Sequence, residues 1–369
     1  MKIPLNDLSR AYQHHAAIYD KILTEVGGSG YYLNGPRVNA FAVKFAKYIG
    51  TTYCLPVGNG TDALELALRG AGVNAGDHIL TVANAGGYTT TACNIIGAVP
   101  NYVDIDPDTL LIDLDQAVSL ANSHTKAIVL THLYGAVVDT TLLKKKLLAA
   151  GKDNIRIIED SSQAHGAKIH DKLAGCFGDI ATFSFYPTKN LGAFGDAGAI
   201  MCHDVAIFEK LKYLHQYGWS SKYTVSLPQG RNSRMDEIQA AILLARLPML
   251  EEANQKRRNI LDIYSKAAAS SPISFPKRSG QTPAAHLAVA MVPHRDSFRA
   301  FLAKRGVATE IHYPVLDCDQ PGWQSLPHLG AELPQSRRRS SQIVTLPCFP
   351  EMTAEEIQTV ADALAAFYQ

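Results

Sequence analysis

Short apolar runs alternate with amphipathic segments along the middle of the chain. From about residue 53 onward, six apolar runs rich in β-branched and aromatic residues predict strands: Tyr53–Val57, His78–Ala83, Val99–Asp104, Lys126–His132, Ile155–Glu159 and Ile180–Phe185. Amphipathic helices are expected between several of them, for example over Asp62–Arg69 and Thr140–Ala150. Strands that alternate with helices predict an α/β fold with a mainly parallel sheet covered by helices on both faces.

The segment before this alternation and the one after it are expected to be helical. Residues 1–50 predict an N-terminal helical arm, divided by the glycine-rich stretch Gly27–Gly30. Ser233 and Asp236 have the spacing of a capping box, which predicts the start of a helix. Pro248 should kink or end that helix, because proline has no N–H and clashes with the preceding turn.

The C-terminal third predicts a second, smaller unit. A helical stretch from about Glu251 to about Ala269 would join it to the first one, as such connectors often do. It is followed by a strand-like segment, a helix and a final helix, at His286–Val292, at about Asp296–Arg305 and from about Thr353. We therefore expect a large domain over residues 1–250 and a small C-terminal α/β domain over residues 251–369.

Composition excludes several classes of protein. The 369 residues have a net charge of +1 and no basic stripe, which argues against nucleic-acid binding. The six cysteines are scattered without a C-x-x-C pair, so we expect no metal site, no disulfide framework and reduced thiols in a cytoplasm. The first residues lack the apolar core of a signal peptide, and no apolar run approaches the roughly 20 residues that span a bilayer.

The first motif with possible chemistry is a glycine-rich turn. Gly58–Ala63 fits the dinucleotide pattern G-x-G-x-x-G/A, between a predicted strand and a predicted helix. A dinucleotide site also needs an acidic residue at the end of the next strand, but Asp77 precedes that strand. The turn is then either purely structural or a phosphate site. In a phosphate site, the N–H groups of Gly60, Thr61 and Asp62 at the helix start would hold one phosphate.

The second and third motifs also follow predicted strands. Glu159 and Asp160 end one apolar run, and Gln163 and His165 follow them in a polar cluster that packing does not explain. Either carboxylate could protrude into a ligand crevice or simply form an ion pair on the surface.

Lys189 follows the next strand, between aromatic residues and a glycine-rich return with glycines at 192, 195 and 198. Most lysines are solvated, but flanking aromatics can desolvate this one, which lowers its pKa and makes it a nucleophile and proton carrier. A lysine, a carboxylate and a phosphate-binding turn form the set that pyridoxal phosphate (PLP) chemistry requires.

Six segments carry a resemblance to a known family: Gly28–Gly30 with Leu33–Pro36, Gly60–Leu64, Glu159–Gly166, Phe183–Gly198, Arg231–Ala241 and His312–Pro314. Over nearly its whole length the chain resembles the PLP-dependent sugar aminotransferases of fold type I, the DegT/DnrJ/EryC/StrS group. The resemblance implies ping-pong transfer of an amino group, with L-glutamate as the expected donor, to a nucleotide-linked keto sugar. It also implies a homodimer with shared active sites.

The resemblance assigns a role to individual residues. Lys189 would form the Schiff base with PLP, and Asp160 would bind the pyridine nitrogen. Gln163 would contact the hydroxyl side of the ring, and Tyr88 would stack on it. The phosphate would be bound by Gly60, Thr61 and Ser184, and by Asn232 of the other subunit. The sugar nucleotide would be faced by His312 and Tyr313, together with Tyr217 and Lys222.

Other segments resemble the subgroup that acts at C3 of dTDP-linked 3-keto-6-deoxyhexoses to give dTDP-3-amino-3,6-dideoxyhexoses: Val82–Tyr88, Thr131–Gly135 and Leu346–Pro350. The chain departs from the family pattern at Phe41-Ala42, where Phe-Glu is usual, and in Leu316–Asp319, where a histidine is usual. A UDP-linked keto sugar is therefore an alternative substrate. A PLP-dependent sugar dehydratase would carry histidine in place of Lys189, and a non-catalytic sensor would not need the lysine, carboxylate and phosphate-binding set. An NAD-dependent oxidoreductase would rest on Gly58–Ala63 alone.

Overall fold

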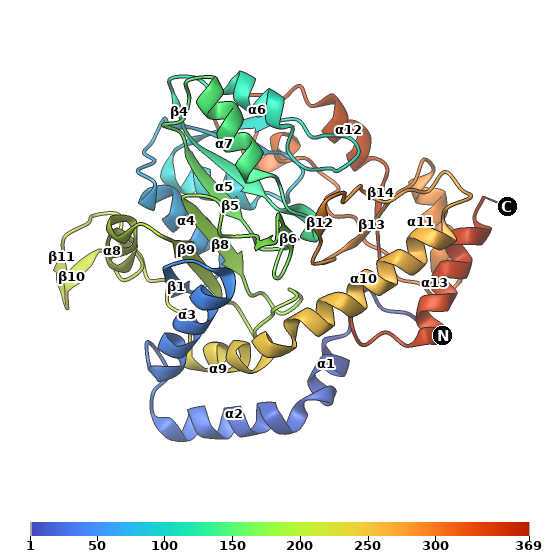
Figure 1. Ribbon diagram of the computed structural model, residues 1–369, viewed down its shortest axis with the longest axis horizontal. Coiled ribbons are helices and arrows are strands. Elements are labelled where there is room, and N and C mark those ends of the chain that lie inside the picture. Colours follow the sequence, from blue (N-terminus) through green and yellow to red (C-terminus); the bar gives the residue numbers. More distant parts are fainter. Residues whose placement is uncertain (1, 369) are drawn as a thin grey trace.

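The chain folds around a seven-stranded mixed sheet, as Figure 1 shows for the computed structural model, which describes residues 2–368. The order of strands is β1-β9-β8-β5-β4-β2-β3. These strands are β1 (Tyr53–Val57), β2 (His78–Val82), β3 (Val99–Val103), β4 (Thr125–Thr131), β5 (Arg156–Asp160), β8 (Ile180–Ser184) and β9 (Gly198–Cys202). Each of the six predicted strands is present and begins and ends within one residue of its predicted bounds.

Helices cover both faces of the sheet (Figure 1). The helices are α1 (Leu8–His14), α2 (Ala16–Ser29), α3 (Pro36–Ile49), α4 (Gly60–Gly70), α5 (Tyr88–Ile96), α6 (Leu114–Leu120), α7 (Thr140–Ala149), α8 (Val205–Leu214), α9 (Glu237–Arg246), α10 (Leu250–Ala267), α11 (Arg295–Lys304), α12 (Pro334–Ser340) and α13 (Ala354–Ala366). Alternate residues of β4 enter different cores: Ala127 and Val129 pack with α4, α5 and α8, whereas Ile128 and Leu130 pack with α6 and α7. This alternation confirms the expected sheet with two covered faces.

One strand of the sheet differs from the sequence-based expectation. The pattern places Gly198 in the glycine-rich return after Lys189, but residues 198–202 form β9, which is antiparallel to both β1 and β8. All five residues are buried, so small and apolar side chains here fill the space between two strands. The sheet is still mostly parallel, since β8, β5, β4, β2 and β3 run in one direction.

The predicted capping box is wrong. α9 begins at Glu237, its N-cap is Asp236, and no side chain caps it. The hydroxyl of Ser233 instead accepts a hydrogen bond from the N–H of Gly58 at 3.0 Å, and the Glu237 carboxylate accepts two N–H groups in the first turn of α3. These long-range partners replace the local cap, and they tie the segment before α9 to the glycine-rich turn.

The C-terminal part has its own core and its own small sheet. β13 (Ala288–Met291) pairs antiparallel with β14 (Ile343–Leu346), and the two pack with α10, α11 and α13. As Pro248 predicts, α9 ends before it, and a 3-10 turn, Leu247–Met249, leads into α10. α10 spans both parts, because Leu250 packs under α3 whereas Ile260 and Tyr264 pack in the C-terminal core. A domain boundary at residue 250 stays a prediction.

The remaining elements are short. Three further strands form a small sheet in the order β12-β6-β7, and two form a hairpin: β6 (Lys168–Ile169), β7 (Lys172–Leu173), β12 (Gln281–Thr282), β10 (Trp219–Ser221) and β11 (Thr224–Val225). The other 3-10 turns are Leu133–Gly135, Asp317–Asp319 and Pro321–Trp323. Within residues 2–368, no helix combines the length and the apolar character needed to cross a membrane.

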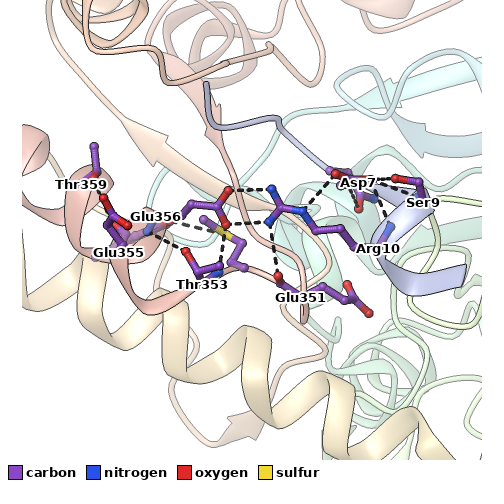
Figure 2. Close-up of polar contacts among 11 residues, drawn as sticks. Asp7, Ser9, Arg10, Glu351, Thr353, Glu355, Glu356 and Thr359 are labelled. Atoms are coloured by element: carbon purple, nitrogen blue, oxygen red, sulfur yellow. Dashed lines mark hydrogen bonds and ion pairs between the residues drawn. The ribbon is translucent and has the colours of Figure 1, made fainter. Parts of the chain in front are cut away.

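The N-terminal arm is fastened to the C-terminal part. Ile3 is fully buried in the C-terminal core. Figure 2 shows that Arg10 faces the carboxylate of Glu356, and its Nη1 and Nη2 each lie 2.8 Å from one of the two oxygens. Glu356 also completes a capping box with Thr353 at the start of α13, so one carboxylate joins the arm and the last helix. The buried Ile3 and the ion pair of Arg10 with Glu356 together fix the path of the residues between them.

Candidate active site

A cavity of about 590 Å³ lies beyond the carboxyl ends of the strands. Nine of the twelve predicted site residues line it: Gly60, Thr61, Tyr88, Asp160, Gln163, Ser184, Lys189, His312 and Tyr313. They come from both parts of the chain, so the cavity exists only when the C-terminal part is packed against the large sheet. Ligands in open α/β sheets bind in this position.

The N-terminus of α4 forms one wall. Asn59 caps the helix by accepting a hydrogen bond from the N–H of Asp62 at 2.8 Å, which leaves the N–H groups of Gly60 and Thr61 at the helix start. Gly60 packs on Ser184 so closely that an added Cβ would lie 2.6 Å from the Ser184 Cβ. The free N–H groups and the helix dipole suit an anion such as a phosphate.

The negative charge of Asp62, next to this wall, is compensated by an arginine. Asp62 is buried and forms an ion pair with Arg231 at 2.8 Å. Arg231 also pairs with Glu65 in the next turn of α4. Asp62 therefore does not line the cavity as a repelling charge.

The end of β5 supplies two carboxylates with different surroundings. Glu159 is fully buried and points away from the cavity, where its oxygens accept hydrogen bonds from His132 and from three backbone N–H groups. Asp160 is 4% exposed and lines the cavity, and one of its oxygens accepts the N–H of Ser162 at 3.1 Å. Side chains alternate along a strand, so only one of the pair can face the ligand.

Lys189 lies in the turn after β8, within the same cavity as Asp160. Burial lowers the pKa of Lys189 to about 8, and the nearby Asp160 carboxylate partly opposes this shift. The turn is tight, because a side chain at Gly192 would overlap the carbonyl group of Pro187. A buried amine that is partly neutral near pH 8 can act as a nucleophile and carry protons.

Aromatic and amide side chains form the wall opposite α4. Gln163 accepts the N–H of Tyr134 at 2.7 Å and donates to the hydroxyl of Tyr313 at 3.1 Å. The ring of Tyr313 packs on Gly86, and the rings of Tyr313 and Tyr88 meet edge-on at 6.3 Å. His312 is held by Thr345 at 2.9 Å, and burial lowers its pKa. The sequence-predicted Gln163, Tyr88 and His312-Tyr313 thus belong to one wall.

The segment in which the usual histidine is missing supports this wall from behind. Asp317 is buried, its N–H donates to the carbonyl of Ala83 at 2.8 Å, and its carboxylate accepts the hydroxyl of Thr90 at 2.7 Å. Burial raises the pKa of Asp317 to about 7. The departure from the family pattern therefore places a carboxyl group behind the loop that carries Tyr88, and not in the cavity.

Three predicted site residues lie apart from the cavity of this chain. Asn232 and Lys222 are exposed, and Tyr217 is 39% exposed. Tyr217 and Lys222 belong to the region of the β10–β11 hairpin, which projects from the body of the molecule at the left of Figure 1. Asn232, Lys222 and Tyr217 therefore do not line the cavity of their own chain.

Several residues that line the cavity were not expected from the sequence. They include Leu5 and Asn6 of the N-terminal arm, and Arg257, His286 and Cys348 around α10 and β14. Nothing in their sequence context distinguishes them, because the folded chain brings them to the cavity from distant segments. His165, by contrast, is buried beside two phenylalanine rings of β8 and its continuation and does not line the cavity.

The whole chain has relatives of known sequence and structure. The sequence model of the DegT/DnrJ/EryC1/StrS aminotransferase family matches residues 15–365. The dTDP-3-amino-3,6-dideoxy-alpha-D-galactopyranose transaminase of Aneurinibacillus thermoaerophilus is 38% identical over 366 residues, which cover 98% of each chain. The pleiotropic regulatory protein of Geobacillus stearothermophilus is 35% identical over 373 residues, 100% of this chain and 99% of that protein.

Among solved structures, the X-ray structure of Streptomyces venezuelae DesV in complex with a ketimine intermediate superimposes with a TM-score of 0.95. The two chains are 34% identical, and the match covers 100% of this chain and 99% of that chain. The similarity of the fold therefore includes both parts of the molecule.

Proposed function

The chain belongs to the DegT/DnrJ/EryC1/StrS aminotransferase family, and from this premise we propose that it transfers an amino group from L-glutamate to a nucleotide-linked keto sugar, with PLP as cofactor. One observation carries the proposal. A buried lysine, a strand-end carboxylate and the N-terminus of a helix line a single cavity. The lysine would react with the aldehyde of PLP, the carboxylate would bind its pyridine nitrogen, and the helix N-terminus would bind its phosphate.

The residues that are present fit the cofactor. Gly60 and Thr61 at the start of α4, with the hydroxyl of Ser184, would hold the phosphate. Asp160 would hold a proton on the pyridine nitrogen, and Tyr88 and Gln163 would bind the faces and the hydroxyl side of the ring. The close packing of Gly60 on Ser184 supports this fit, because any larger residue at position 60 would separate the two phosphate-binding elements.

The side chains of this protein supply proton transfer and orientation. PLP, when bound, provides the aldehyde that takes up an amino group and a ring that withdraws electrons from a breaking C–H bond. Lys189 would carry that proton on its Nζ, for which its lowered pKa suits it. His312 and Tyr313 would orient the sugar nucleotide, and the surrounding aromatic wall would exclude water.

Within the family we propose C3 of a dTDP-linked 3-keto-6-deoxyhexose as the substrate position, which gives a dTDP-3-amino-3,6-dideoxyhexose for polysaccharide synthesis in the cytoplasm. The name of the relative from Aneurinibacillus thermoaerophilus supports this choice. A UDP-linked keto sugar is the alternative, since the nucleotide would be bound away from the residues proposed to hold PLP. A regulatory role, which the name of the relative from Geobacillus stearothermophilus suggests, would not require the lowered pKa of Lys189.

We also propose a homodimer with shared active sites. Exposed apolar residues gather on the arm formed by α2 and the turn after it, at Ile18, Leu23, Tyr31, Tyr32 and Leu33. Large exposed apolar patches mark protein–protein interfaces, so this group of exposed apolar side chains supports an interface at the arm. In the dimer, Asn232, Tyr217 and Lys222 would complete the cavity of the other subunit.

Mass spectrometry of product tests the proposed function. The purified protein, with PLP and L-glutamate, is offered a panel of dTDP- and UDP-linked keto sugars. We expect the wild type to form an amino sugar from the dTDP-linked 3-keto-6-deoxyhexose. We expect no amino sugar from the Lys189→Ala variant. Turnover by Lys189→Ala at the wild-type rate would show that the assignment of the lysine is wrong, and product from UDP sugars alone would favour the alternative.

A further inference from the structure

Asn190, which follows the site lysine, holds a tight turn of the C-terminal part. Its Nδ2 donates hydrogen bonds to the carbonyl oxygen of Ala284 at 2.8 Å and to Oδ1 of Asn254 at 2.7 Å. Its Oδ1 lies 2.9 Å from Nδ1 of His286. Ala285, between the two bonded residues of the turn, has a φ of +51°, which is uncommon for a residue with a side chain. Strained backbone of this kind gathers at functional sites, so the turn is a candidate for such a role.

The chain of amide groups determines which nitrogen of His286 carries the proton. Asn254 donates from Nδ2 to the carbonyl oxygen of His165 at 2.8 Å, so its Oδ1 is the atom that accepts from Asn190. Asn190 also donates to a backbone carbonyl, which can only accept, so its Nδ2 is the donor and its Oδ1 the acceptor. Nδ1 of His286 faces this acceptor and therefore carries the proton that it donates.

The other ring nitrogen of His286 presents a lone pair to the cavity. His286 lines the cavity, and its Nε2 has no hydrogen-bond partner within residues 2–368 but retains accessible surface. Burial and the positive charges of Lys189 and Arg257 hold the pKa of the imidazole well below its usual value, and the nearby His165 and His312 act in the same direction. The ring is therefore neutral near pH 7, and Nε2 can accept a hydrogen bond from a ligand.

The chemistry of the expected ligands selects the group that Nε2 can bind. Carboxylate and phosphate oxygens offer only lone pairs, so they cannot donate to a neutral acceptor. The phosphate of PLP and the carboxylates of the amino donor are therefore unsuitable partners. Sugar hydroxyl groups can donate, and a 3-keto-6-deoxyhexose carries them on C2 and C4, beside the keto carbon. The keto carbon must lie within reach of Lys189, which lines the same cavity as His286.

We propose that Nε2 of His286 accepts a hydrogen bond from a sugar hydroxyl group on C2 or C4, next to the keto carbon. The inference rests on the proposed function and identifies a residue that selects the sugar. L-Glutamate has no alcohol group, so the two substrates that share the cavity differ in the group that this nitrogen recognises. His286 would then serve the sugar reaction and not the reaction with the amino donor.

The test compares two replacements of His286 in the PLP-loaded protein. His286→Asn keeps an N–H donor on the atom bonded to Cγ, so it can still bind Asn190, but it has no group at the place of Nε2. His286→Gln reaches that place with its amide and loses the donor next to Cγ. The reactions with L-glutamate and with the keto sugar nucleotide are followed separately by absorbance. His294→Asn, at an exposed position before α11, is the matched control.

The sugar reaction should be affected selectively. For His286→Asn we expect kcat/KM for the keto sugar to fall by about tenfold or more, as when a buried hydrogen bond loses one partner. For L-glutamate, kcat/KM should stay within about twofold of the wild type, and His294→Asn should change neither reaction by more than this. His286→Gln should lie between His286→Asn and the wild type, because its amide oxygen can accept from a hydroxyl group.

Deoxy sugars identify the hydroxyl group that is bound. Keto sugar nucleotides without the hydroxyl on C2 or on C4 are offered to the wild type and to His286→Asn. One of the two should be about tenfold poorer than the parent sugar for the wild type, whereas His286→Asn should not distinguish it from the parent sugar.

Two further readouts do not depend on turnover. Nitrogen magnetic resonance of labelled histidine in the cofactor-free protein should show a neutral His286 ring with its proton on Nδ1. His286→Asn should melt close to the wild-type temperature because it keeps the bond to Asn190. His286→Gln should melt lower, because it leaves the amide oxygen of Asn190 without this donor.

Any of four results would overturn the inference: equal losses in the two reactions, a sugar reaction that His286→Asn leaves unchanged, deoxy sugars that the wild type accepts as well as the parent sugar, or a proton on Nε2. Absence of any reaction of the wild type with keto sugars would instead refute the proposed function itself.

Discussion

Glu159→Gln should strongly destabilise the protein, because it disrupts a buried network directly beneath the cavity carboxylate. Oε2 of Glu159 accepts hydrogen bonds from His132 Nε2 at 2.8 Å and from the N–H of Gly175 at 3.0 Å. Oε1 accepts the N–H groups of Phe177 and Gly178 at 2.7 and 2.6 Å. Both oxygens thus have two donors, and the carboxylate and the imidazole cannot turn to water, since Glu159 and His132 are fully buried.

The histidine cannot adapt to a glutamine. The N–H of Val138 donates to Nδ1 of His132, so the proton of the neutral ring is on Nε2. Whichever way the amide of the introduced side chain is oriented, its NH₂ group faces two donors that lose their acceptor. A buried donor without a partner costs about 1–3 kcal/mol, so the two together cost about 2–6 kcal/mol. This is a large share of a typical stability of about 5–15 kcal/mol.

Urea denaturation at pH 7.5 measures the change, with Glu252→Gln on the exposed face of α10 as the matched control. Glu252 pairs only with Lys256 on the surface, so its replacement should change the free energy of unfolding by no more than about 0.5 kcal/mol. Should Glu159→Gln also stay within about 0.5 kcal/mol of the wild type, the reasoning about the buried donors would be refuted.

The same network makes stability depend on pH. Burial raises the pKa of Glu159, but the hydrogen bonds from His132 and the backbone outweigh it and lower the pKa overall. A lowered pKa stabilises the folded state above the unfolded value of about 4.3, and this contribution is lost as the pH falls through the folded pKa. Glu159→Gln should therefore be less sensitive to acid than the wild type.

Three other consequences of the site can be measured. The sugar reaction should speed up with pH and level off above about 8, because Lys189 must lose its proton to act as a base; a profile that is flat from about pH 6.5 to about 9.5 would contradict this. Gly60→Ala should weaken PLP binding about tenfold in a spectrophotometric titration, because its Cβ would lie 2.6 Å from the Cβ of Ser184; unchanged affinity would argue against phosphate binding there. Gly86→Ala should raise KM for the sugar nucleotide about tenfold with a smaller effect on kcat, since its φ is +82° and its Cβ would lie 2.7 Å from the Tyr313 ring; an unchanged KM would remove that wall from substrate binding.

Much of the fold could be predicted because the strands are buried on both faces. The run at Tyr53–Val57 is apolar throughout and the run at Ile180–Ser184 mostly so, and the sequence marks their bounds closely. β9 has the same burial but begins with glycine and alanine, whose small side chains carry no strand signal. Ser233 satisfied the local rule for a cap, yet its hydroxyl binds Gly58, which is 175 residues away in the chain. A local sequence pattern cannot reveal a partner that is so distant along the chain.

The candidate site could be predicted where strand ends converge. Asp160 ends β5, Ser184 ends the neighbouring strand β8, and Lys189 lies in the turn after β8, so parallel topology brings them together. Arg257 could not be identified, because Arg257 and Arg258 are adjacent arginines on one helix and only the packing of α10 decides which enters the cavity. Tyr217, Lys222 and Asn232 do not line the cavity of their own chain, so their assignment to the site rests on the proposed dimer.

The most direct test of the account is the identity of the lysine that binds the cofactor. The protein is incubated with PLP, reduced with borohydride, digested and analysed by mass spectrometry. The account predicts a pyridoxyl label on Lys189, whose pKa of about 8 leaves its amine partly neutral, and none elsewhere at stoichiometric yield. A label on another lysine, or a protein that binds no PLP, would contradict it.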